Sequence, residues 1–110
     1  MEDAATAIIK PLKDLENECN IDLPRRILAE KNQAFSKLMQ CIKKFPNNQE
    51  VKLQCLKNIA SLVQGYPDVV TMEAFALICE GLEQVTGIPL YLKYLITICF
   101  YLRTVWKPFQ

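Results

Sequence analysis

The sequence predicts an all-α fold. Apolar residues recur every three or four positions along almost the whole chain, and no segment keeps for long the period of two that strands require. Only 3 of the 110 residues are glycine, too few for a turn-rich β-sandwich. We expect four apolar stripes to be buried: Ile8, Leu12, Leu15 and Cys19; Phe35, Leu38, Ile42 and Phe45; Leu56, Ile59, Ala60 and Val63; Phe75, Ile78, Cys79 and Leu82.

Capping residues predict where the helices begin. Asp22 is expected to cap the helix at 23–31, whose first turn contains Pro24. Asn47 or Asn48 is expected to cap the helix at 48–64, and Thr71 the helix at 71–84. The predicted helices are about 4–19, 23–31, 33–45, 48–64 and 71–84, followed by an apolar helix at about 89–105.

Proline and glycine predict where the helices end. Phe45 precedes Pro46 and is therefore pushed out of helical geometry. Gly65 is expected to end the next helix, and Pro67 prevents it from resuming. Pro11 either opens the first helix or lies inside it and kinks it. Helices this short, with connections of one to six residues, are typical of a bundle or an α-solenoid.

Residues 47–83 resemble an armadillo repeat. The segment 56–60, Leu-Lys-Asn-Ile-Ala, matches the core of the long third helix of such repeats, and Gly65, Pro67 and Asp68 match the turn that follows. Upstream, the segment 19–35 reads Cys-Asn-Ile-Asp-Leu-Pro-Arg-Arg-Ile-Leu-Ala-Glu-Lys-Asn-Gln-Ala-Phe. It is similar to the armadillo repeat-containing protein six family, in which Cys-x-x-Asp-Leu precedes a basic residue, Leu-Ala and Ala-Phe or Ala-Tyr. The resemblance covers about residues 12–84.

The resemblance implies an armadillo-type α-solenoid fragment of about five to six helices that binds proteins and has no catalytic activity. Members of the family are several hundred residues long, so the chain is expected to be a truncated or alternatively terminated form with one to two repeats. Because about three repeats are needed for a stable solenoid, we expect self-association or low stability.

The resemblance also implies a binding site. The asparagine of the armadillo core motif lies in a groove and bonds the backbone of an extended peptide, a role that would fall to Asn58. Gln54 and Glu50 lie four and eight positions earlier on the same helical face, and Ser61 lies three positions later. We predict that these four polar residues contact a protein or extended peptide; the alternative is that Asn58 is simply an amide facing solvent.

Residues 85–110 differ in composition from residues 1–84. They contain no Asp or Glu, three basic residues, three of the four tyrosines and the single tryptophan. We therefore predict a domain of armadillo-like repeats at 1–84 and an apolar, basic, helical tail at 85–110 that is not repeat-like. The tail is expected to pack on the 71–84 helix through a stripe of five residues: Leu92, Leu95, Ile96, Cys99 and Leu102. The alternative is a small tail-anchored membrane protein that uses residues 88–106.

Composition argues against catalysis and against nucleic-acid binding. The chain contains no histidine, so Ser36 and Ser61 lack the usual activating base, and its net charge is only +1. The carboxylate pairs Glu16/Glu18 and Glu80/Glu83 lie on polar helix faces without a predicted pocket. We expect no enzyme activity, no cofactor and no metal site. The basic residues are expected to be solvated, because no aromatic residues alternate with them as stacking platforms: Arg25, Arg26, Lys31, Lys43 and Lys44.

Cysteine usage predicts an intracellular protein. The five cysteines are odd in number, and no two form a Cys-x-x-Cys pair. The acidic N-terminal sequence Met-Glu-Asp-Ala lacks the features of a secretory signal. We expect buried, inert, reduced thiols and a cytoplasmic or nuclear location.

Overall fold

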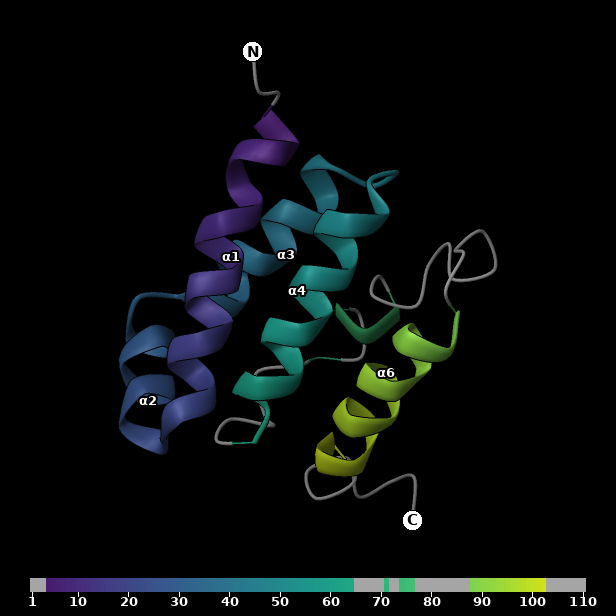
Figure 1. The fold of residues 1–110 in the computed structure, drawn as a ribbon. Coiled ribbons are helices and arrows are strands. Elements are labelled where there is room, and N and C mark those ends of the chain that lie inside the picture. The colour runs from purple at the N-terminus through teal and green to yellow at the C-terminus, as the bar shows by residue number, and fades with distance from the viewer. Residues whose placement is uncertain (1–3, 65–70, 72–73, 77–87, 103–110) are drawn as a thin grey trace.

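The computed structural model describes residues 4–64, 71, 74–76 and 88–102. Within these residues every regular element is a helix, which confirms the predicted all-α class. The helices are α1 (Ala4–Ile21), α2 (Leu23–Lys31), α3 (Ala34–Lys44), α4 (Gln49–Leu62) and α6 (Ile88–Leu102) (Figure 1). Residues 74–76 are also helical.

The predicted capping residues begin the helices as expected. Asp22 is the N-cap of α2, and its Oδ1 accepts a hydrogen bond of 3.1 Å from the Arg25 backbone nitrogen. Asn48 caps α4 in the same way through the backbone nitrogen of Val51, at 3.0 Å. The Thr71 hydroxyl accepts from the backbone nitrogen of Ala74, at 3.1 Å.

The helix limits agree closely with the predicted ones, and Pro11 lies inside α1 rather than at its start. Phe45 has φ of −124° and ψ of 61°, outside the helical region, so α3 ends there as predicted. Gln33 begins α3 in the left-handed region, with φ of 61°. Gly65, Pro67, Asp68 and most of the predicted 71–84 helix lie outside the described residues.

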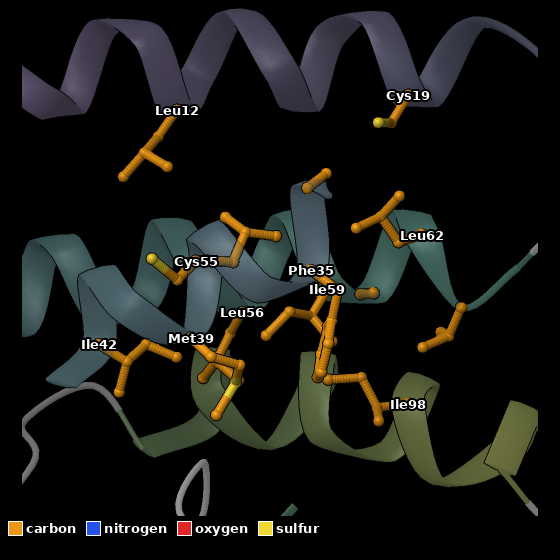
Figure 2. Packing of buried hydrophobic residues seen from close by; sticks show 14 of the residues in the cluster. Leu12, Cys19, Phe35, Met39, Ile42, Cys55, Leu56, Ile59, Leu62 and Ile98 are labelled. Atoms are coloured by element: carbon orange, nitrogen blue, oxygen red, sulfur yellow. The ribbon is translucent and has the colours of Figure 1, made fainter. Parts of the chain in front are cut away.

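Helix α4 lies at the centre of the described structure. It contacts α1, α3 and α6, and α2 adds a smaller contact. Figure 1 shows α1, α4 and α6 running in the same general direction, with α4 between the other two. Figure 2 shows Leu12 and Cys19 of α1 on one side of α4 and Ile98 of α6 on the other.

The predicted stripes form the core. All four residues of the α4 stripe are buried, as are Phe35, Leu38 and Ile42 of α3 and Leu12 and Cys19 of α1. Ile8, Leu15, Phe45 and Phe75 are half-buried against this core, whereas Ile78, Cys79 and Leu82 lie outside the described residues. The helical periodicity therefore identified the core faces of α1, α3 and α4.

The predicted stripe of α6 is partly wrong. Leu95 and Ile98 are buried, but Ile96 is 66% exposed and Cys99 is also exposed. Since α6 rests on α4, its contact face is centred on Leu95 and Ile98, and Ile96 turns away from it. Nothing in the described residues shows α6 packed on a 71–84 helix, because most of that segment lies outside them.

Candidate functional site

The predicted binding residue Asn58 is inaccessible in the structure. Its side chain is 0% exposed, because α1 covers this face of α4. The Asn58 Nδ2 donates to the backbone oxygen of Leu12 at 2.9 Å and to that of Gln54 at 3.0 Å. Asn58 therefore links α4 to α1 and does not face a groove.

Two more of the predicted binding residues are buried in the same contact. Gln54 Nε2 donates to Glu16 Oε1 at 2.8 Å, and the Ser61 hydroxyl bonds Asn20 Oδ1. Only Glu50 is exposed. The prediction that Asn58, Gln54 and Ser61 form an open binding face is therefore wrong for this structure, and so is the alternative of a solvent-facing amide. The polar stripe of α4 faces another helix.

An apolar hollow lies elsewhere, between α1, α2 and α3. This α1–α2–α3 groove is open to solvent and has a volume of about 530 Å³. Its lining is mainly apolar, and Leu28 at its edge is 60% exposed. The residues that line it are Pro11, Leu12, Leu15, Glu18, Arg25, Leu28, Ala29, Asn32, Ala34, Lys37, Leu38 and Cys41.

Charged groups at the α2 end of the groove are paired with one another. Arg25 Nε lies 2.9 Å from Glu18 Oε2, and Arg25 Nη1 lies 2.8 Å from Asp22 Oδ2. These pairs are largely exposed, so each contributes little to stability, but together they satisfy the arginine. Asn32 Nδ2 is likewise engaged with the backbone oxygen of Leu28, at 3.0 Å.

A second hollow of about 290 Å³ continues the groove between α1 and α3. It is lined by Ala4, Ile8, Lys37, Gln40, Cys41, Lys44 and Phe45, so Lys37 and Cys41 border both hollows. Lys37 and Lys44 are exposed and lie on the α3 side; we refer to them as the basic edge. Neither forms an ion pair within the described part of the chain, and Lys44 Nζ lies 5.6 Å from the centre of the Phe45 ring.

The described thiols are free and poorly suited to nucleophilic chemistry. Burial raises the pKa of Cys55 to about 12 and raises the pKa of Cys19 and Cys41 above 9.0. The pKa of Cys99 is also raised by burial, although the residue as a whole is exposed. Cys41 is half-buried. Among the described cysteines, the expectation of buried thiols therefore holds only for Cys19 and Cys55. Cys79 lies outside the described residues.

The described residues contain no group of three or more histidine, cysteine, aspartate or glutamate side chains that could hold a metal ion. None of the helices traced there is both long enough and apolar enough to cross a bilayer, and α6 has 15 residues.

Comparison with known proteins identified no relative. No family model matches the sequence, and neither a curated protein nor a solved structure is significantly similar to it.

The groove was not predicted from the sequence. Leu28 and Lys37 belong to helices that were correctly predicted, but the groove depends on how three helices meet. One signal was present in the sequence: Leu23, Ile27 and Leu28 give the short α2 more apolar residues than one face can bury. In the structure Leu23 is 47% exposed and Leu28 more so.

Proposed function

We propose that this protein is a non-enzymatic protein-interaction module with an armadillo-type arrangement of helices. The observation that carries the proposal is the open, mainly apolar α1–α2–α3 groove with Leu28 at its edge. An exposed apolar hollow bordered by polar side chains is typical of a protein-binding surface. The prediction of an extended peptide bound at Asn58 is not retained, because α1 covers that residue.

The helix order supports the armadillo-type arrangement. Helices α1, α4 and α6 begin at residues 4, 49 and 88, which are intervals of 45 and 39 residues. This is close to the roughly 40–47 residues of one armadillo or HEAT repeat. The three helices run in the same general direction (Figure 1), as equivalent helices of successive repeats do.

This arrangement gives α6 a place in the helical array. Helix α6 rests on one side of α4 as α1 rests on the other. The proposal therefore differs from the expectation, drawn from composition, that residues 85–110 are not repeat-like. Composition reports surface chemistry and charge, whereas the repeat is defined by the spacing and packing of helices.

The chemistry of the groove supports binding rather than catalysis. Its titratable side chains are Glu18, Arg25, Lys37 and Cys41, of which the first two are paired with each other. The raised pKa of Cys41 keeps its thiol protonated near neutral pH. No two of these groups form the hydrogen-bonded nucleophile and base that covalent catalysis requires.

A binding experiment on the full chain tests the proposal. The probe is a synthetic helical peptide with leucines spaced by three and four residues and glutamines at its other positions. We expect NMR amide shifts to change along α1, α2 and α3, and Leu28→Asp to abolish the change. The control is Ile96→Asp, which places the same charge at a similarly exposed residue of α6. Shift changes that survive Leu28→Asp, or that cluster on α6, would refute the groove as the binding site.

A further inference from the structure

We propose that the α1–α2–α3 groove binds an acidic amphipathic helix, with the apolar face of the partner in the groove and its carboxylates along the basic edge. This inference rests on the proposed function, since it names the partner class for the same groove. It follows from three features of the described residues: the distribution of charge around the groove, the spacing of the basic edge, and the helical nature of the walls.

The charge around the groove is one-sided. Helix α3 contains Lys37, Lys43 and Lys44 and no acidic residue. The α1 side of the groove is lined by Ala4, Ile8, Pro11, Leu12, Leu15 and Glu18, of which Glu18 is charged and is paired with Arg25. Because Arg25 already binds Glu18 and Asp22, the lysines of the basic edge are the cations left for a partner. A partner with carboxylates on the side facing α3 is therefore complementary.

The spacing of the basic edge matches a helix. Lys37 and Lys44 are seven residues apart, which is two turns, so they lie on the same side of α3 about 10 Å apart along its axis. A second helix lying along α3 would place carboxylates seven positions apart opposite these two lysines. Its leucines, at positions between the carboxylates, would face the apolar lining of the groove.

The walls favour a helical partner over an extended one. Helices form the walls of the groove, and their backbone groups are hydrogen-bonded within the helices. An extended peptide placed here would find no strand edge to pair with its backbone, whereas a helix satisfies its own backbone hydrogen bonds. The groove and the second hollow together run along α1 and α3 from Leu28 to Ala4.

Three peptides of equal length and leucine spacing test the inference on the full chain. Their charged-edge positions hold glutamate, glutamine or lysine, and binding is measured by fluorescence anisotropy at low and high salt. We expect the glutamate peptide to bind about tenfold more tightly than the lysine peptide at low salt, because exposed charge pairs have modest energies. The difference should shrink at high salt, since screening weakens exposed pairs.

Charge variants locate the interaction. The double variant Lys37→Glu/Lys44→Glu should reverse the order of the three peptides, and Lys37→Gln/Lys44→Gln should abolish the preference. The control is Lys43→Glu, which changes the charge of α3 by as much as Lys37→Gln/Lys44→Gln does, at an exposed lysine that lines neither hollow. It should shift each affinity by less than about twofold. Circular dichroism of each variant verifies that the helix content of the protein is retained.

The outcomes separate the inference from the proposed function. If all three peptides bind equally and Leu28→Asp blocks each, the groove binds helices but the acidic preference is wrong. If none of the peptides binds and the protein is a monomer, both the function and the inference are overturned. If the protein is a dimer that Leu28→Asp converts to a monomer, while no peptide competes, a second copy occupies the groove and the acidic-helix inference is wrong.

Discussion

Substitution of Asn58 tests whether a polar face of α4 is structural. In the structure, the amide nitrogen of Asn58 donates to backbone oxygens of Leu12 and Gln54, and its side chain is completely buried. Asn58→Ala removes both hydrogen bonds. Asn58→Asp keeps the shape of the side chain but replaces the donor with an oxygen that faces two other oxygens.

The structure sets the size of the two effects. A typical hydrogen bond contributes about 0.5–1.5 kcal/mol net, so two bonds give about 1–3 kcal/mol. Asn58 Oδ1 is buried and has no hydrogen-bond partner among the described residues, so Asn58→Ala also removes an unfavourable group. We therefore expect a loss of about 1–2 kcal/mol for Asn58→Ala. For Asn58→Asp at neutral pH we expect about 3–5 kcal/mol, the range for a buried charge without a partner.

The pH dependence of Asn58→Asp has a definite sign. Burial raises the pKa of the introduced carboxyl above its unfolded value of about 3.9. The native state then keeps a proton that the unfolded chain releases, so the free energy of unfolding of the variant falls as pH rises above about 4. Part of the lost stability should therefore return in acid, relative to wild type at the same pH.

Urea unfolding followed by circular dichroism measures these differences. The matched control is Asn32→Asp, because the exposed Asn32 also donates from Nδ2 to a backbone oxygen four residues earlier, at 3.0 Å. That substitution should cost less than about 1 kcal/mol, since water solvates the new charge. If Asn58→Asp is as mild as Asn32→Asp, Asn58 faces solvent and the α1–α4 contact described above is incorrect.

Three further predictions concern the core, a thiol and a cap. Leu56→Ala should lower the free energy of unfolding by about 2–5 kcal/mol, because it truncates a buried leucine. Leu28→Ala should change it by less than about 0.5 kcal/mol, because Leu28 is exposed. Similar losses for the two variants in urea unfolding would contradict the burial of Leu56 and the exposure of Leu28. Because the pKa of Cys55 is raised from 9.0 to about 12, the unfolded chain loses this proton first, and stability should fall as pH rises from about 9 to 12. Equal alkaline loss in Cys55→Ala would exclude that thiol as a cause. Asp22→Ala should cost about 1 kcal/mol in thermal unfolding by removing the cap of α2, and no change would show that the cap is dispensable.

The helix limits were predictable because they depend on residues close together in the sequence. Asp22 and Asn48 bond backbone nitrogens three residues later, and Phe45 is restricted by the proline that follows it. The core faces of α1, α3 and α4 were predictable for the same reason, since residues three or four apart share a face. Local chemistry therefore determines most of the element boundaries.

The packing of α6 was less predictable. Its described residues are nearly all apolar, so several stripes satisfy the same periodicity. The predicted stripe included Ile96, which is 66% exposed, and omitted Ile98, which is fully buried. The choice between stripes is made by the surface of α4 against which the helix packs. That surface is supplied by α4, which ends 26 positions before α6 begins, and a local pattern does not encode it.

The environment of α4 explains why the predicted site was misplaced. A polar stripe on a helix indicates that something polar lies beside it, and water is only one such neighbour. Here the partners of Gln54, Asn58 and Ser61 are groups of α1 that lie 38, 46 and 41 positions away in the sequence. A central helix can thus be amphipathic by sequence and buried on both faces.

The same comparison indicates where a functional surface should be sought in this fold. The polar residues of α4 are satisfied by α1, so their chemistry is used within the molecule. Leu28 is the opposite case: it is an apolar residue that folding leaves 60% exposed beside an open groove. Exposed apolar area loses contact with water only when a partner covers it. An exposed apolar residue such as Leu28 is therefore a better indicator of the binding surface than the polar stripe of α4. It places that surface at the α1–α2–α3 groove.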